Sequence, residues 1–239
     1  MSNVATTLTL ATPIPGVWVF LFVFVLAVLF PIADYILYSR LKSTMQVYIW
    51  NIVALWALTI GCVRLIHNAG MSIADFGQRP GTFPRTLIAF GVLVLAIGGV
   101  VLLNKRQKKK STPEQLNRAV GKVRKLLPVT GSERMLYVVV AFTAGFCEEF
   151  LYRGWLMTLV GNAFSSMWAG LIASSICFGI AHAYQGRTGI LSTGVLGLVF
   201  ALIFIASGSL LPGQILHAVM DLNNGLAMGS VVSRDPEHA

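Results

Sequence analysis

The side chains best able to do chemistry are carboxylates and imidazoles that stand in pairs inside apolar sequence. Glu149 and Arg153 are four residues apart, as are His217 and Asp221, so each pair would share one face of a helix. Glu148 would point about 100° away from Glu149, so an ion pair between Glu149 and Arg153 would leave Glu148 free to react. Such groups can activate water, donate to a developing oxyanion and protonate a leaving amine. The spacing therefore predicts a centre that hydrolyses its substrate with activated water.

A second histidine, His182, lies in another apolar run, one helical turn after Phe178. In the predicted centre Glu148 is the base, His182 holds the water with it, and His217 faces the oxyanion. An unpaired ionisable group costs a few kcal/mol at bilayer depth, and packing alone could use Ser, Thr or Asn at lower cost. We therefore expect six side chains to meet one another or water: Glu148, Glu149, Arg153, His182, His217 and Asp221.

The same residue types leave two other chemistries open. A zinc ion could be held by Glu148, His182, His217 and Asp221, and it would then activate the bound water. Cys147 could instead act as a thiol nucleophile with His182 as its base, although a thiol in apolar surroundings is poorly reactive. The three cysteines have no C-x-x-C spacing, so they predict neither a disulfide framework nor a zinc knuckle.

The elements that position these residues are expected to be membrane-spanning helices. Of the 239 residues, 56% are hydrophobic and only 11% are charged, whereas soluble domains carry roughly a quarter charged residues. The mean hydropathy is +0.75, which excludes a soluble globule. Apolar runs long enough to cross a bilayer predict an all-α, polytopic membrane protein with the site in the bundle interior. The seven predicted spans are 14–37, 45–66, 84–104, 134–159, 163–184, 188–207 and 209–231.

The charge distribution predicts how the helices are oriented in the membrane. Half of the 18 basic residues lie between Lys105 and Lys125, and Lys and Arg accumulate in cytoplasmic loops. Loop 105–128 and the C-terminus are therefore expected in the cytoplasm and the N-terminus outside. The net charge of +9 thus indicates orientation and contact with anionic lipid, and it does not indicate nucleic-acid binding. Asp34 and Arg64 are expected near span ends, where a charge can reach the interface.

The chain is expected to form one membrane domain with two functional parts. Residues 1–133 would supply three spans and the basic loop, and residues 134–239 would supply a catalytic core of four helices that carries the motifs. Residues 67–85 would form a short interfacial segment followed by turns. The abundant small residues of the last four spans permit close helix approach, but they do not indicate an oligomeric state.

Three motifs in order resemble those of a known family. They are E-E-x-x-x-R at residues 148–153, F-x-x-x-H at 178–182, and H-x-x-x-N/D at 217–221. The chain resembles the CPBP, or Abi, family of intramembrane proteases, which are named for CAAX processing and bacteriocin processing and include the prenyl endopeptidase. The resemblance covers roughly residues 134–231. The first three spans match only in their hydropathy.

The resemblance implies an endopeptidase whose conical cavity opens to the cytoplasm and the bilayer. It implies that Glu148 and His182 activate water, that His217 and residue 221 stabilise the oxyanion, and that Glu149 with Arg153 holds the site together. The family is described both as a metallopeptidase and as a metal-free glutamate peptidase. Its substrates would be membrane-associated peptides or proteins, either prenylated or carrying a bacteriocin-type leader.

Two features of the sequence keep an alternative open. The prenyl-processing branch resembles this pattern with Asn at the position of Asp221, and an ionised Asp would repel an oxyanion. Asp221 would then be protonated, bind a metal or orient His217, and Asn224 could supply the missing donor. The alternative function is a non-proteolytic membrane protein, either an immunity scaffold or a proton-coupled transporter, that uses the same buried groups as a relay. Its activity would persist in a variant unable to cleave peptides.

Overall fold

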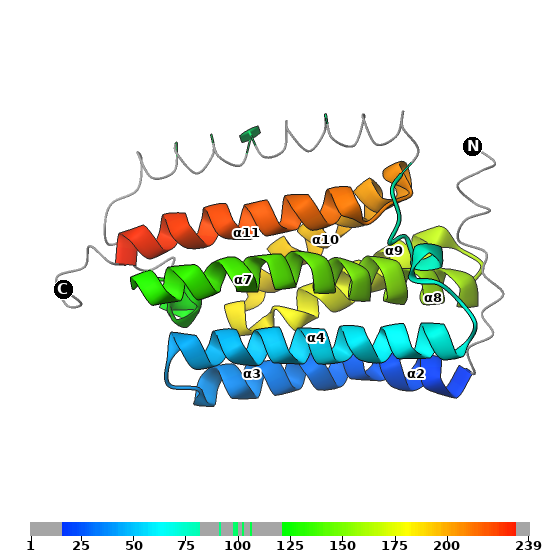
Figure 1. The fold of residues 1–239 in the computed structure, drawn as a ribbon, viewed down its shortest axis with the longest axis horizontal. Helices are drawn as coiled ribbons and strands as arrows, with labels where there is room; N and C mark the ends of the chain where they lie inside the picture. Colours follow the sequence, from blue (N-terminus) through cyan, green and yellow to red (C-terminus); the bar gives the residue numbers. More distant parts are fainter. Residues whose placement is uncertain are drawn as a thin grey trace.

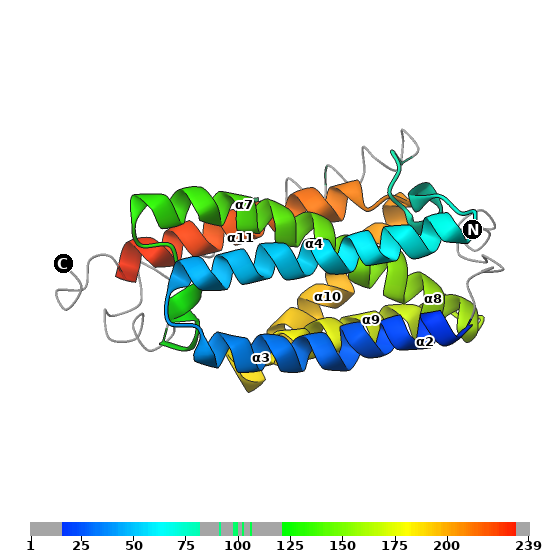
Figure 2. The same ribbon diagram turned by 60° about the horizontal axis from the view of Figure 1, so that its bottom comes forward.

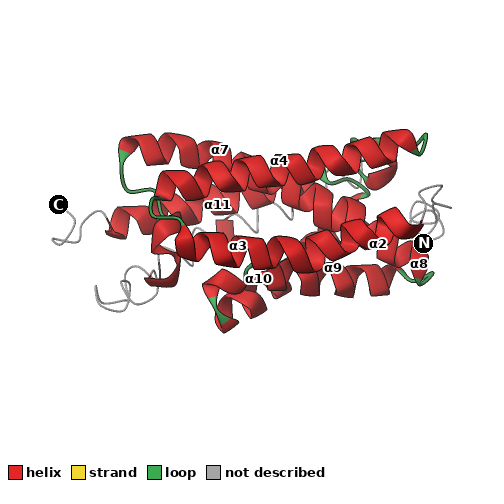
Figure 3. Ribbon diagram, turned by 90° about the horizontal axis from the view of Figure 1, so that it is seen from below, coloured by secondary structure: helices red, strands yellow, loops and turns green. Residues whose placement is uncertain are grey.

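The computed structural model describes residues 16–81 and 121–232, together with Gly91, Gly98, Gly99, Leu102 and Arg106. The described part of the chain is a bundle of helices without strands (Figures 1 and 3). Helix α2 (Gly16–Phe24), a π-helical turn (Val25–Leu29) and α3 (Phe30–Arg40) form one continuous helix. Helix α4 (Thr44–Asn68) follows and completes a hairpin with it.

The second half of the chain supplies the rest of the bundle. Helix α7 (Gly131–Glu148) continues without a break through a π-helical segment (Glu149–Leu156) into α8 (Met157–Ala163). Helices α9 (Met167–Ala181), α10 (Arg187–Ser207) and α11 (Leu211–Val232) follow. Short 3₁₀ helices connect these elements at Ile73–Phe76, Gly121–Leu126 and Ala183–Gln185.

The prediction of an all-α membrane protein is confirmed. Four described helices are long and apolar enough to cross a bilayer: Gly16–Arg40, Thr44–Asn68, Gly131–Ala163 and Arg187–Ser207. Helix α9 is shorter, at 15 residues, and α11 carries the polar residues of the third motif. The span predicted at 84–104 and most of the basic loop 105–128 lie outside the described residues.

Side-chain caps explain where several helices begin. Ser43 and Gln46 form a reciprocal capping box at the start of α4, and Thr130 and Glu133 form another at the start of α7. The hydroxyl of Ser166 accepts a hydrogen bond from the backbone N–H of Ala169 at the start of α9. These short polar residues satisfy backbone N–H groups that have no partner within the helix.

Helix α7 lies in the middle of the bundle, between α4 and α11 (Figures 1 and 2). Glycine permits the close approach of α7 and α11, since a Cβ atom on Gly145 would lie 2.8 Å from the carbonyl oxygen of Gln214. Buried aromatic residues, among them Phe150, Trp155 and Phe178, fill the space between α7, α8 and α9. The outer faces of the helices remain apolar, as expected for contact with lipid.

The side chain of Asp34 is buried and has a partner on the next helix. Asp34 lies six residues before the end of the continuous helix Gly16–Arg40, is 7% exposed, and accepts a hydrogen bond of 3.1 Å from the indole N–H of Trp50 on α4. The partner is 16 residues away in the chain and belongs to the next helix, so no spacing rule within one span could reveal it. The N-terminal helices therefore contain a buried carboxylate of their own.

A short segment after α4 covers the end of the bundle where α11 begins. The backbone N–H of Leu210 donates to the carbonyl of Gly77 at 2.9 Å, and the side-chain amides of Gln78 and Gln214 exchange two hydrogen bonds. Phe76 packs on Trp155 with ring centroids 5.2 Å apart. We call residues 73–79 the cap segment. The expected interfacial segment is thus tied to the second half of the chain.

Gly77 is required by the geometry of the cap segment. Its φ of +87° is a conformation that residues with a side chain rarely adopt, and a Cβ atom would lie 2.3 Å from the Phe204 ring. We expect Gly77→Ala to lower the free energy of unfolding by about 1–3 kcal/mol, measured by denaturant titration in detergent. Gly16→Ala, whose Cβ would meet nothing within 4 Å, is the control, and equal stability of the two variants would contradict this account.

Candidate active site

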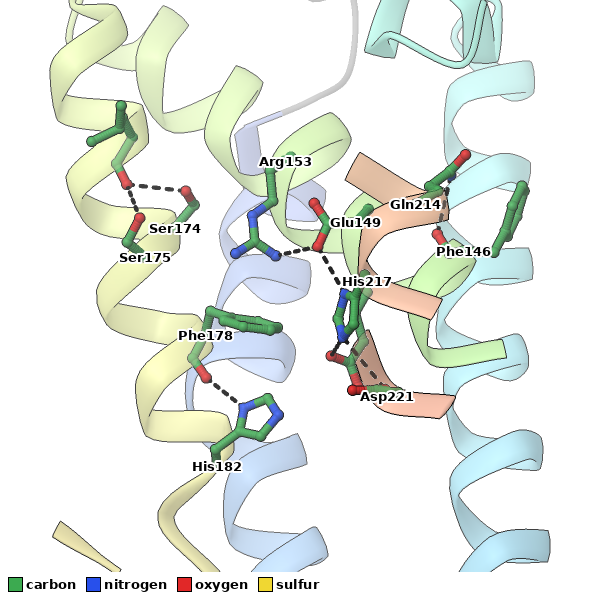
Figure 4. Close-up of polar contacts among 12 residues, drawn as sticks. Phe146, Glu149, Arg153, Ser174, Ser175, Phe178, His182, Gln214, His217 and Asp221 are labelled. Atoms are coloured by element: carbon green, nitrogen blue, oxygen red, sulfur yellow. Dashed lines mark hydrogen bonds and ion pairs between the residues drawn. The ribbon is translucent and has the colours of Figure 1, made fainter. Parts of the chain in front are cut away.

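Glu149 is the centre of a buried ionic network. Its Oε1 atom accepts hydrogen bonds from Nη1 of Arg153 at 2.9 Å and from Nδ1 of His217 at 3.0 Å (Figure 4). The three residues are 1%, 0% and 4% exposed. The carboxylate therefore links the first motif on α7 to the third motif on α11. The predicted pair of Glu149 and Arg153 is present, and it also fixes the imidazole of His217.

The aromatic rings of two helices enclose this network. The guanidinium carbon of Arg153 lies 4.1 Å from the ring centroid of Phe178 and 5.3 Å from that of Phe200. Phe200 also stacks on the His217 imidazole, with centroids 5.1 Å apart and an angle of 15° between the planes. Cation–π attraction and stacking therefore hold the buried cation and the imidazole in place.

Most of the first motif lies in a π-helical segment, Glu149–Leu156. The spacing of the motif residues predicts an α-helix at this position. Single π-helical turns inside α-helices often occur at functional sites. Gly154 lies in this segment, and a Cβ atom on it would lie 2.8 Å from the carbonyl oxygen of Phe76. Residues four apart still lie close to one face, so the ion pair with Arg153 forms despite the wider turn.

The other ring nitrogen of His217 faces two further carboxylates. Its Nε2 atom lies 3.8 Å from Oε2 of Glu148 and 3.7 Å from Oδ2 of Asp221. Both distances exceed those of a direct hydrogen bond, so a water molecule or a substrate atom could contact both sides. The side chains of Glu148 and Asp221 are 14% and 37% exposed. Oε2 of Glu148 accepts no hydrogen bond from any described residue.

His182 stands at the end of α9, across from His217 in Figure 4. Its Nδ1 atom is 2.8 Å from the carbonyl oxygen of Phe178. Because a carbonyl oxygen can only accept, Nδ1 carries the hydrogen, and Nε2 of the neutral ring presents a lone pair. His182 is therefore prepared to accept a proton or a hydrogen bond.

A cavity of about 470 Å³ connects the second and third motifs. Its wall includes His182, His217 and Asp221, and the helical turn after Asp221 adds Asn224. Apolar side chains line the part near the 3₁₀ helix Gly121–Leu126, so the cavity is polar at one end and apolar at the other. A pocket of this kind can hold a peptide segment beside the ionisable groups.

The predicted residues fall into two groups in space. Five of them form one connected network, in which no link exceeds 3.8 Å: Glu148, Glu149, Arg153, His217 and Asp221. His182 makes no hydrogen bond or ion pair with these five residues, but it shares the cavity wall with His217 and Asp221, and its ring packs on Phe178 at 4.7 Å. Sequence spacing could relate residues within one helix. It could not give the link between Glu149 and His217.

Tyr137 is a site residue that the sequence did not reveal. Tyr137 belongs to the cavity lining, and its hydroxyl donates to the backbone carbonyl of Asp221 at 3.0 Å. A Cβ atom on Gly225 would lie 2.2 Å from the Tyr137 ring, so this glycine makes room for it. A tyrosine in an apolar run carries no motif signal, and only the packing of α7 on α11 identifies it.

The predicted set of four zinc ligands is not grouped together in the described part of the chain. Among the residues that the structure describes, no three His, Cys, Asp or Glu side chains are grouped as metal ligands. Nδ1 of His217 is bonded to Glu149, and its Nε2 lies 3.8 Å from Glu148 and 3.7 Å from Asp221. The fourth predicted ligand, His182, makes no hydrogen bond or ion pair with these residues, and its Nδ1 lies against the carbonyl oxygen of Phe178. Cys147 is fully buried in the hydrophobic core, as a packing residue would be.

Comparison with known proteins identifies the region that carries the motifs. Residues 130–223 match the family model described as "Type II CAAX prenyl endopeptidase Rce1-like". This match contains all three motifs and extends from the capping box of α7 to the residues just after Asp221. No curated protein and no solved structure matches the chain significantly.

Proposed function

We propose that this chain, whose residues 130–223 match the Rce1-like prenyl endopeptidase model, is an intramembrane endopeptidase of the CPBP type that acts by glutamate-activated water. The observation that carries the proposal is the position of the His217 Nε2 atom. It faces both Glu148 and Asp221 at just under 4 Å, beside a cavity whose wall also contains His182.

The first step requires a base and an acceptor for water. In the proposed reaction Glu148 takes a proton from water while the lone pair of His182 Nε2 orients the other hydrogen. The water oxygen then bonds to the peptide carbonyl carbon, whose oxygen becomes an oxyanion. The Glu148 carboxylate suits this role because its Oε2 atom accepts no hydrogen bond from a described residue.

The second step requires a donor for the oxyanion and an acid for the leaving amine. When His217 is protonated, Nδ1–H donates to Glu149 and Nε2–H can donate to the oxyanion. The proton held by Glu148 passes to the peptide nitrogen, the C–N bond breaks, and the amine leaves. Glu149 and Arg153 orient His217 without touching the substrate.

Asp221 has a different role from the one that the resemblance implies for residue 221. Its carboxylate is not hydrogen-bonded to His217, because the separation from Nε2 is 3.7 Å. Glu149 already orients the imidazole, which removes that task from Asp221. We infer that Asp221 is protonated when the oxyanion forms, so that its carboxyl group can face the bound peptide without repelling the developing charge.

The test is cleavage of a peptide library by the purified full chain in lipid vesicles, followed by mass spectrometry. The library contains matched prenylated and unprenylated peptides and leader-type peptides. We expect cleavage at internal bonds that persists after chelation, with metal content measured on the same sample. Cleavage lost on chelation and restored by Zn²⁺ would contradict the metal-free step. Proton flux across vesicles without cleavage of any peptide would favour the transporter.

A further inference from the structure

The outer surface of helices α9 and α10 carries a second hollow, separate from the catalytic cavity. It is an apolar groove of about 510 Å³ that runs between the two helices. The helix backbones approach closely at Gly179 and Gly194, since a Cβ atom on Gly179 would lie 3.2 Å from the Gly194 Cα. We call this hollow the α9–α10 groove. None of the six proposed catalytic residues lines it.

The walls of the α9–α10 groove are aliphatic side chains that face outwards. Leu191, Ile176 and Val195 line it and are 71%, 56% and 53% exposed. Exposed aliphatic side chains on a membrane-spanning helix meet lipid rather than water. A groove there therefore fits a flexible hydrocarbon chain.

The groove has one charged residue at one end. Arg187 is the first residue of α10 and belongs to the groove lining. The lining continues along α10 to Leu198, and this distance is about 16 Å at 1.5 Å per residue. That length equals about half of the roughly 30 Å hydrocarbon core, which is the depth of one leaflet. Arg187 would thus stand at the level of the lipid headgroups.

We propose that the α9–α10 groove binds one acyl chain of an anionic phospholipid whose phosphate is bound by Arg187. The occupant is chosen by its charge and its length. The aliphatic walls accept any acyl chain, while the guanidinium selects a negative headgroup and can form two parallel hydrogen bonds to phosphate. Arg187 begins α10 at the same end of the bundle as the end of α3 and the start of α7, where Arg40 and Arg134 lie (Figures 1 and 2).

The test uses the purified full chain with phosphatidylglycerol and phosphatidylcholine of identical acyl chains. Native mass spectrometry at increasing collision energy measures which lipid is retained. We expect phosphatidylglycerol to be retained about fivefold better, as one Arg near an anionic headgroup predicts. Arg187→Gln should abolish this preference. Val195→Trp, which places a large side chain in the groove, should reduce the retention of both lipids.

Two matched variants control for general effects on charge and surface. Arg134→Gln removes an exposed basic residue at the same end of the bundle, and Leu202→Trp adds an indole to an exposed position of α10 outside the groove lining. Both should retain lipid as the unmodified chain does. Equal retention of the two lipids, or a preference unchanged by Arg187→Gln, would overturn the proposal. Displacement of both lipids by a prenylated peptide would assign the groove to a substrate instead.

Discussion

Replacement of Glu148 by Gln is expected to reduce peptide cleavage roughly a thousandfold while the protein remains folded. The amide has nearly the same shape as the carboxylate but cannot accept a proton from water. The Oε2 atom of Glu148 accepts no hydrogen bond from a described residue, so the substitution breaks no hydrogen bond at that atom. The measurement is kcat/KM for the best library peptide in vesicles, together with thermal unfolding of the same preparation.

The matched control is Glu133→Gln, which makes the same substitution on the same helix. Glu133 belongs to the capping box at the start of α7, and Gln can fill that position as well as Glu. Its cleavage rate should stay within about twofold of the unmodified chain. If Glu148→Gln cleaves as fast as this control, Glu148 is not the base and the proposed first step is wrong.

Replacement of Arg153 by Met should destabilise the protein by about 3–5 kcal/mol and abolish cleavage. The side chain is fully buried, and its guanidinium donates to Glu149 at 2.9 Å. Met preserves much of the apolar contact with Phe178 and Phe200, but it leaves the Glu149 carboxylate buried without its cation. Unfolding by denaturant in detergent measures the loss of stability.

A double substitution separates the lost charge from the lost packing. The variant with Glu149→Gln and Arg153→Met removes both charges, so it should be more stable than Arg153→Met alone. The exposed residue Arg134, on the same helix, serves as the reference, and Arg134→Gln should change stability by no more than about 0.5 kcal/mol. A double variant that is less stable than Arg153→Met would show that Arg153 does not stabilise the protein through its ion pair with Glu149.

The helices and their ends could be predicted well from the sequence, because apolar runs and caps are local signals. The run predicted at 188–207 is α10 at Arg187–Ser207, and the run at 209–231 is α11 at Leu211–Val232. The pairs at i and i+4 were also predictable, and the ion pair between Glu149 and Arg153 is confirmed.

Contacts between helices could not be predicted from spacing alone. The bond from Glu149 to His217 joins residues 68 positions apart, and the bond from Trp50 to Asp34 joins two separate helices. The position of Asp34 along its span could be predicted, but its hydrogen bond with Trp50 could not, because the partner belongs to another helix. The π-helical turn at Glu149–Leu156 was also hidden, because the residue types of this segment suit an α-helix equally well.

The cap segment limits the sides from which the His217 turn of α11 can be reached. It joins Gly77 to Leu210 and Gln78 to Gln214, and Gln214 precedes His217 by about one helical turn. The cavity of about 470 Å³ is lined by Tyr137 and Leu127 and by none of the residues of the cap segment. Under the proposed function, a peptide would therefore reach the His217 turn from this cavity and not past the cap segment.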